Sequence, residues 1–339
     1  MKPRHAVVWS AGYQCDIGMH VFPVTKYARV HRELVDGGDV RAEDVLEPPP
    51  PSRELLELAH TREYLDDLDA LRWTPRTAYS ELPLEPAIVR AFSLAASGTT
   101  LAARAALESG AGVHVGGGLH HAYADHAEGF CYINDLAVAV RSLQREGRVT
   151  RAAVVDLDVH QGNGTAHIFR DDAGVFTLSL HQQDNYPVPK ERGDLDIGLA
   201  DGTGDEAYAR ALEAALERVW EHRPQVVLYQ AGADPFHDDQ LGGLALTFAG
   251  LEARDRAVLE GCARRGIPVV TTLGGGYARN VEDTVQHPRD DMPDHARTRA
   301  SNAVSRAPGR FAGRRDRPRC FPLLVSGVIL CGVTAQRFM

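Results

Sequence analysis

Residues 152–165 read AAVVDLDVHQGNGT, and this stretch decides the fold that we predict for the chain. Its first four residues are apolar with no polar residue between them, which is typical of a strand buried on both faces of a parallel sheet. Asp156, Asp158 and His160 then follow at every second position. Because side chains two residues apart point to the same side of an extended chain, we expect two carboxylates and an imidazole to lie together where a buried strand ends.

Carboxylates at such a place destabilise the fold unless they are paired or bind a cation. A divalent metal ion would satisfy them, since carboxylate and imidazole groups are common ligands of these ions. The same pattern also suits a strand-end cap, in which the side chains accept hydrogen bonds from backbone N–H groups. Taken alone, the motif leaves both interpretations open.

Apolar runs and helical patterns alternate along most of the chain. This alternation predicts an α/β fold, with a single domain built on a mostly parallel sheet and helices on both faces. The predicted strands are residues 5–9, 112–115, 152–156, 175–180, 226–230 and 269–273, and the predicted helices are residues 26–35, 62–71, 86–108, 134–146, 205–221 and 251–264.

Polar residues follow each predicted strand. Ligands of such sheets bind beyond the carboxyl ends of the strands, so Asp234, which follows the strand at 226–230, should lie near Asp158. Two carboxylates and one imidazole would leave a zinc ion with an open position for water and substrate. The same ligands suit Fe²⁺, Co²⁺ or Mn²⁺. The alternative for Asp234 is a turn residue before Pro235.

Two other strand exits carry residues suited to catalysis. His120 and His121 follow three glycines, and Tyr277 follows residues 274–276, which are also glycines. Histidine is the side chain best matched to proton transfer near neutral pH, and a tyrosine hydroxyl can donate to a developing oxyanion. The alternatives are a solvated loop for the two histidines and a surface position for the tyrosine.

Composition excludes several classes of protein. The 339 residues are 44% hydrophobic and 24% charged, as in a globular protein with a full core. The net charge of −9 argues against a nucleic-acid partner. Five scattered cysteines without a CxxC pair fit a reducing cytoplasm. The N-terminus does not resemble a signal peptide, and the apolar stretch at 323–335 is too short to cross a membrane. We therefore predict a cytoplasmic protein without a membrane partner.

Charge divides the chain into two parts. Residues 286–339 hold ten arginines, no lysine and four aspartates, so they carry +6 and leave −15 for residues 1–285. This tail also lacks a sustained helical or strand period. We predict a catalytic domain at 1–285 and an atypical Arg-rich tail at 286–339, either disordered or an aberrant end such as a frame shift would produce.

Seven short motifs together resemble the histone deacetylase family. They occur in the family's order: HTREYL at 60–65, GGGLHHA at 116–122, GFCYIND at 129–135, DLDVHQGNGT at 156–165, QAGAD at 230–234, LGGL at 241–244 and GGGY at 274–277. The HQGNG segment and FPVTKY at 22–27 look most like the class IV and small bacterial branch. The resemblance implies the arginase/deacetylase fold and a zinc-dependent hydrolase that removes acetyl or longer acyl groups from lysine side chains or related amines.

The resemblance also implies a role for each matching residue. Asp158, His160 and Asp234 would be the zinc ligands, and His121 would be the general base and acid. His120 would be its electrostatic neighbour, hydrogen-bonded to Asp156.

On the substrate side, Tyr277 would polarise the scissile carbonyl. Gly129 would meet the substrate amide, and Phe130 and Tyr186 would wall the acyl-lysine channel. Many family members pair the second histidine with an aspartate; here that position is Asn163, which offers a hydrogen bond without a charge. A structural potassium ion is implied near Asp156, Asp158, His160, Ser179 and Leu180.

Three alternatives remain at this point. A ureohydrolase with two manganese ions shares the fold, but Gly232 stands where that chemistry needs a second carboxylate. An amidohydrolase acting on acylpolyamines would keep the chemistry, and the negative charge of residues 1–285 suits a cationic substrate. An inactive acyl-lysine binder would keep the cavity without turnover.

Overall fold

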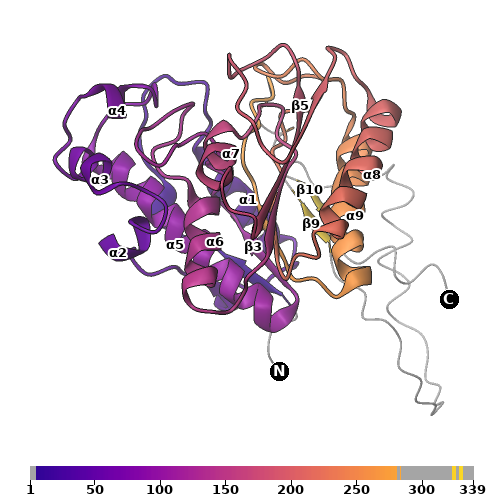
Figure 1. Ribbon diagram of the computed structural model, residues 1–339, viewed down its shortest axis with the longest axis horizontal. Helices are drawn as coiled ribbons and strands as arrows, with labels where there is room; N and C mark the ends of the chain where they lie inside the picture. The colour runs from indigo at the N-terminus through magenta and orange to yellow at the C-terminus, as the bar shows by residue number, and fades with distance from the viewer. Residues whose placement is uncertain (1–4, 281–282, 284–322, 326–327, 331–339) are drawn as a thin grey trace.

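The computed structural model describes residues 5–280, 283, 323–325 and 328–330, and it contains one large parallel sheet (Figure 1). The eight strands lie in the order β2-β1-β3-β8-β7-β4-β5-β6, and every neighbouring pair is parallel. This confirms the predicted α/β class. The strands are β1 (Ala6–Val8), β2 (Val45–Leu46), β3 (Ala111–His114), β4 (Ala152–Asp156), β5 (Val175–Gln182), β6 (Leu195–Leu199), β7 (Val227–Gln230) and β8 (Val269–Thr272).

Helices cover both faces of this sheet. Figure 1 shows α8 and α9 together on one side of the strands and α5 and α6 on the other. The helices are α1 (Thr25–Asp36), α2 (Arg53–Leu56), α3 (Arg62–Asp69), α4 (Pro75–Ala78), α5 (Pro86–Ser109), α6 (Asp135–Arg145), α7 (Asn163–Phe169), α8 (Asp205–Glu221) and α9 (Phe248–Arg265), with short 3₁₀ turns at Ala11–Tyr13 and Ala42–Asp44.

The interior strand β4 lies between two hydrophobic cores, as its unbroken apolar run predicts. Val154 belongs to the core that contains Leu136 of α6. Val155 belongs to the core that contains Val258 of α9. Both valines are almost completely buried. An apolar side chain on each face of the strand is therefore needed to join the sheet to both helical layers.

All six predicted strands are present, but the edge strands β2 and β6 were not predicted. β2 has only two residues, and β6 alternates partly buried and exposed side chains over LDIGL, so neither has the continuous apolar run used as the signal. Helix α7 was also missed, because it begins within the glycine-containing segment GNG. Helix α9 begins at Phe248, three residues before the prediction, since the Thr247 side chain caps it by accepting from the Gly250 N–H (3.1 Å).

The predicted Arg-rich tail lies almost wholly outside the described residues. Within it, β9 (Leu323–Val325) and β10 (Val328–Leu330) pair as antiparallel strands. The boundary at 285 and the origin of the tail stay predictions. Within the described ranges, no helix combines the length and the apolar character needed to cross a bilayer.

His60, from the HTREYL motif, links distant parts of this fold. It is buried, and its Nε2 accepts a hydrogen bond from the Asn134 N–H (3.0 Å). The Asn134 side chain in turn caps α6 by accepting from the Ala137 N–H (2.9 Å). Burial lowers the pKa of His60 to about 4, so the imidazole stays neutral in the folded protein.

This neutral histidine predicts a loss of stability in mild acid. A histidine in an unfolded chain has a pKa of about 6.5. Below that pH the unfolded chain binds a proton at position 60 that the folded protein does not bind. Relative to a His60→Gln variant, the free energy of unfolding of the wild type should fall by about 2 kcal/mol between pH 7 and pH 5. Urea unfolding at both pH values measures this difference. Equal pH dependence in the two proteins would contradict the assignment.

Candidate metal centre and active site

Asp158, His160 and Asp234 meet beyond the carboxyl ends of β4 and β7, as predicted. One ligand atom from each residue lies within 4.8 Å of the others. His160 Nδ1 is 3.1 Å from Asp158 Oδ1 and 3.4 Å from Asp234 Oδ2. All three side chains are buried. The three donors therefore converge on one point inside the protein.

Hydrogen bonds hold these ligands in place, so part of the strand-end-cap interpretation is also correct. Asp158 Oδ1 accepts from the His160 N–H (3.0 Å), and Asp234 Oδ1 accepts from the Val159 N–H (2.8 Å). Asp158 Oδ2 accepts from Gln230 Nε2 (2.8 Å) and from the Gly275 N–H (2.9 Å). These bonds do not satisfy Asp234 Oδ2, which is buried without a hydrogen-bond partner.

The electrostatics of the cluster call for a positive charge between the carboxylates. Burial and the nearby Asp158 carboxylate raise the pKa of Asp234 to about 7. Burial alone would lower the pKa of His160, but Asp158 and Asp234 outweigh it and raise that pKa. An oxygen without a partner, two buried carboxylates and an imidazole nitrogen at one point are the donor set of a divalent metal ion.

Two glycines allow the carboxylates to approach each other. A Cβ atom at Gly275 would lie 2.0 Å from Asp234 Oδ2. A Cβ atom at Gly232 would lie 2.2 Å from Asp158 Oδ2. Position 232 therefore has no room for the second carboxylate of a two-manganese site. Among the residues that the structure describes, Asp158, His160 and Asp234 form the single cluster that could hold a metal ion.

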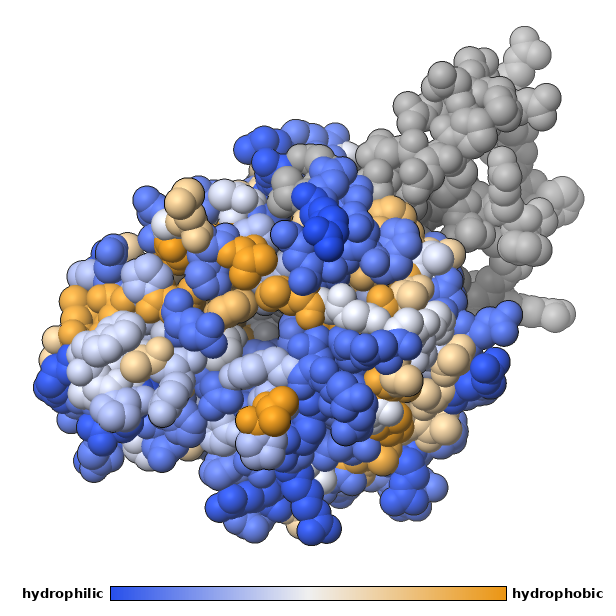
Figure 2. Space-filling model, turned by 90° about the horizontal axis from the view of Figure 1, so that it is seen from above, coloured by the Kyte–Doolittle hydropathy of each residue, from blue (hydrophilic) through white to orange (hydrophobic). Residues whose placement is uncertain are grey.

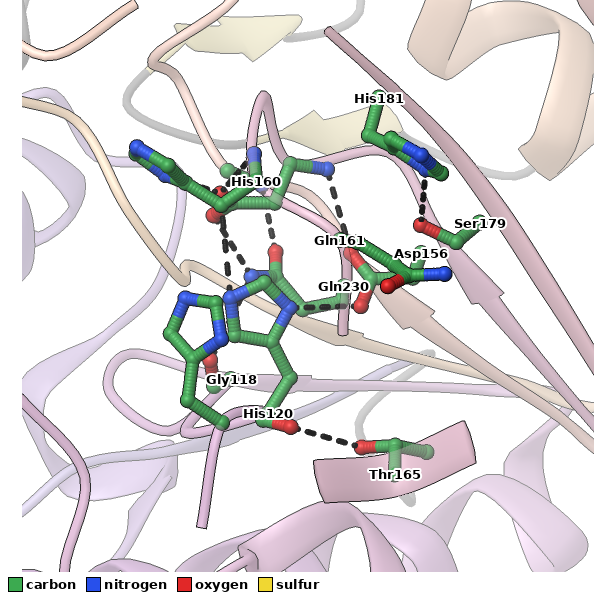
Figure 3. A network of polar contacts seen from close by, with 12 residues as sticks. Gly118, His120, Asp156, His160, Gln161, Thr165, Ser179, His181 and Gln230 are labelled. Carbon is green, nitrogen blue, oxygen red and sulfur yellow. Dashed lines mark hydrogen bonds and ion pairs between the residues drawn. The ribbon is translucent and has the colours of Figure 1, made fainter. Parts of the chain in front are cut away.

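The paired histidines lie beside this cluster and are buried, so the solvated-loop interpretation is wrong. His120 Nδ1 is 2.6 Å from Asp156 Oδ2, which Figure 3 shows as a contact from the loop after β3 to the end of β4. Burial alone would lower the pKa of His120, but Asp156 and Asp158 raise it to about 9.

His121 has a different environment from its neighbour. Its Nδ1 is 2.7 Å from Asn163 Oδ1, so it faces a neutral amide instead of a carboxylate. Burial and the nearby His120 and His160 lower the pKa of His121 well below its usual value. Two adjacent histidines thus differ in charge because they have different partners.

Helix α7 fixes the position of the histidine loop. The Thr165 N–H and hydroxyl both donate to the His120 carbonyl (3.1 and 3.3 Å), and Figure 3 shows the hydroxyl contact. A Cβ atom at Gly164 would lie 2.2 Å from the Ala122 carbonyl oxygen. The GNGT sequence therefore brings the start of α7 directly against the histidines.

The predicted substrate residues line one cavity with a volume of about 220 Å³. Figure 2 views the molecule from above, where apolar residues border a hollow near the middle of the face. Tyr277 is buried in this cavity wall, so the surface interpretation of this residue is wrong. The lining residues are Glu81, His121, Gly129, Phe130, His160, Asn185, Tyr186, Leu241 and Tyr277.

The turn at Gly129 and Phe130 needs an unusual backbone. Both residues have positive φ angles (50° and 63°). A Cβ atom at Gly129 would lie 2.6 Å from the ring of His121, so only glycine allows this close approach. The Phe130 N–H donates to the Ser80 carbonyl (3.0 Å), which holds the turn against the loop before α5.

Sequence reasoning missed Glu81, Asn185 and Leu241 of the cavity lining, and it also missed three residues that form hydrogen bonds at the site. Gln230 binds Asp158, and its place within QAGAD was the signal available for it. Lys26 is buried and donates from Nζ to the Gly274 carbonyl (2.6 Å), although its sequence suggests an ordinary helix surface. Glu128 accepts from Asn163 Nδ2 (2.8 Å), and its position directly before GFCYIND was the only hint.

Comparison with known proteins agrees with this geometry. The family model described as "Histone deacetylase domain" matches residues 20–287. The chain belongs to the histone deacetylase family. Six of the seven motifs that suggested this family in the sequence contribute residues to the candidate metal cluster or to the cavity, and HTREYL is the exception.

Relatives of this chain come from bacteria, archaea, plants and animals. An uncharacterized protein of Picosynechococcus is 42% identical over 78% of this chain and 89% of its own length. A "Probable deacetylase" of Archaeoglobus fulgidus is 33% identical over 69% of each chain. Histone deacetylase 2 of Arabidopsis thaliana is 29% identical over 83% of this chain and 78% of its own length.

Solved structures of the family show the same fold. A homologue from Aquifex aeolicus superposes with a TM-score of 0.71 at 29% identity, over 80% of this chain and 79% of that chain. A homologue in complex with SAHA gives a TM-score of 0.69 at 29% identity and the same coverage.

Asp234 Oδ2, which has no hydrogen-bond partner, gives a test of the candidate metal site. An Asp234→Asn variant keeps an oxygen to accept from the Val159 N–H but removes the negative charge. We expect its metal affinity to fall by about 100-fold, since each side chain that binds the ion directly contributes strongly to binding. Metal content after dialysis and titration of the metal-free protein measure this change.

The same variant also gives a control for folding. Without metal, Asp234→Asn should be at least as stable as the metal-free wild type, because burial and the nearby Asp158 carboxylate disfavour the charge on Asp234. Undiminished metal binding by the variant would remove Asp234 from the ligand set.

Proposed function

We propose that this chain is a metal-dependent hydrolase that removes acetyl or longer acyl groups from lysine side chains or related amines. The observation that carries the proposal is that His121, His160 and Tyr277 line two neighbouring cavities, one of which also reaches Asp158 of the buried Asp158, His160 and Asp234 cluster. This arrangement combines ligands for a metal ion, a candidate base and a hydroxyl donor around the place where an amide carbonyl would enter.

Asp158, His160 and Asp234 would hold the ion, which we propose to be zinc, with Fe²⁺, Co²⁺ or Mn²⁺ as alternatives. When bound, such an ion lowers the pKa of water and polarises a carbonyl oxygen. We also propose a structural potassium ion near Asp156, Asp158, His160, Ser179 and Leu180. The register of the sheet supports it, because Ser179 of β5 lies opposite Asp156 of β4.

His121 is the residue that we assign to proton transfer. Its Nδ1 faces Asn163, which leaves Nε2 as the nitrogen that takes a proton from the attacking water and returns it to the departing amine. His120, paired with Asp156, provides a buried positive charge beside it.

Tyr277 is the residue that we assign to the developing oxyanion. Burial, together with Asp234 and Asp158, raises the pKa of its hydroxyl well above the usual value, so it remains a hydrogen-bond donor. A preorganised donor in a site that excludes water stabilises the charge that forms on the carbonyl oxygen.

Aromatic rings give the cavity a wall suited to an aliphatic chain. Phe130 and Tyr186 border it, and the Tyr186 ring lies 5.0 Å from that of His121, centroid to centroid. Glu81 adds an exposed carboxylate to the lining. That charge favours a cationic carrier for the amine, so an acylpolyamine is our second candidate substrate, and attraction to positive charge is expected to decline with added salt.

Two substitutions test the catalytic assignments. Tyr277→Phe removes one oxyanion donor and should lower kcat by about 100-fold or more. His121→Ala removes the base and should lower kcat by about 100-fold or more. Both variants should keep their metal, since neither residue belongs to the ligand cluster. Hydrolysis of acetyl-lysine peptides, longer acyl-lysine peptides and acetylated polyamines measures the loss and selects between the two substrate classes.

A matched control is Tyr79→Phe, which makes the same chemical change at an exposed tyrosine outside the cavity and should leave kcat unchanged. Wild-type turnover by Tyr277→Phe would refute the oxyanion role. A wild-type protein that binds metal and acyl-lysine peptides but hydrolyses no member of the series would favour the inactive binder.

A further inference from the structure

Glu128 connects the candidate base to the channel wall. Its Oε1 accepts from Asn163 Nδ2 (2.8 Å) and from the Tyr186 hydroxyl (2.7 Å). Its Oε2 lies 3.4 Å from His126 Nε2. The contacts with Asn163 and Tyr186 join segments that are far apart in the sequence. Together with the contact to His126, they hold the carboxylate from several sides.

The chemistry of these groups determines which way the Asn163 amide points. An ionised carboxylate only accepts hydrogen bonds, whereas an amide has one donating end and one accepting end. The nitrogen of Asn163 must therefore face Glu128, and its oxygen must face His121 Nδ1. Because the Asn163 oxygen can only accept a hydrogen bond, His121 Nδ1 must carry the proton. The lone pair of the neutral imidazole is then on Nε2.

Asparagine needs such an orienting group more than aspartate would. Both oxygens of an aspartate accept, so rotation of its side chain by half a turn changes nothing for the histidine. A reversed Asn163 amide would instead present N–H to His121 Nδ1 and favour the tautomer with its proton on Nε2. In that tautomer Nε2 has no lone pair to accept a proton from water.

We propose that Glu128 is a positioning residue that orients the Asn163 amide and thereby selects the His121 tautomer with a free Nε2. The inference rests on the proposed role of His121 as the base. Hydrogen bonds from His126, Tyr186 and Asn163 also lower the pKa of Glu128 against the effect of burial, in keeping with an ionised acceptor.

Two substitutions at position 128 separate this role from simple packing. Glu128→Ala removes the acceptor and should lower kcat by about 10-fold with little change in KM, which corresponds to about nine-tenths of the molecules holding the wrong tautomer. Glu128→Gln keeps an amide oxygen that accepts from both Asn163 and Tyr186, so it should restore kcat to within about 2-fold. Equal losses in the two variants would contradict the proposal.

A second background makes the test sharper. In Asn163→Asp the acceptor for His121 no longer depends on amide orientation, and the new carboxylate lies beside that of Glu128. Adding Glu128→Ala to Asn163→Asp should therefore leave kcat unchanged or raise it, since like charges repel. The same fold loss in both backgrounds would show that Glu128 acts only through packing.

Nitrogen NMR gives a readout that does not depend on turnover. In the zinc-loaded, ¹⁵N-histidine-labelled protein, the His121 signals should show a protonated Nδ1 in the wild type and in Glu128→Gln, and a mixture of tautomers in Glu128→Ala. Loss of the signals in His121→Gln assigns them. An unchanged tautomer in Glu128→Ala would overturn the inference.

Glu146 provides the matched control for both measurements. Its side chain is partly exposed, like that of Glu128 (30% and 23%), and it binds Arg104 at the end of α6, away from the cavity. Glu146→Ala should change neither kcat nor the tautomer. If the wild type shows the expected tautomer but no hydrolysis, the proposed function fails while the orienting role of Glu128 stands.

Discussion

The structure depends on keeping two buried carboxylates close together beside one imidazole. Asp158 and Asp234 repel each other, and burial denies them the solvation that would offset this repulsion. Backbone and side-chain donors satisfy three of their four oxygens, but Asp234 Oδ2 has no hydrogen-bond partner. A cation bound at that point would offset the repulsion between the two carboxylates.

The parallel sheet brings the two carboxylates together. β4 and β7 are neighbours and run in the same direction, so the loops that leave them start side by side. Glycines at 232 and 275 then let the chain approach the carboxylates more closely than any residue with a Cβ atom would. Apolar cores on both faces of β4 hold these exits in place, so the site needs little adjustment to receive an ion.

Different partners give the two adjacent histidines different properties. Asp156 and Asp158 raise the pKa of His120 against the effect of burial, whereas burial and the nearby His120 and His160 lower the pKa of His121. An amide partner must also be oriented with its oxygen toward the histidine, whereas either oxygen of a carboxylate partner would serve. In our proposal Glu128 fixes that orientation, and its carboxylate belongs to the same partly buried hydrogen-bond network as the cavity residue Tyr186.

The sequence alone predicted the α/β class and the interior strands, because these depend on local spacing. Local spacing also predicted that Asp158 and His160 would meet, whereas Asp234, which is far away in the sequence, was predicted from the topology of a parallel sheet and from the family motifs. An apolar run followed by Asp156, Asp158 and His160 at alternate positions places those groups at one strand end whatever surrounds them. Edge strand β6 and helix α7 depend on what they pack against, so their local patterns were weak. The contacts of Glu128 with Asn163 and Tyr186 span 35 and 58 residues, and no local pattern encodes such distances. Only the tertiary structure decided them, since an orienting hydrogen bond needs both partners within about 3 Å.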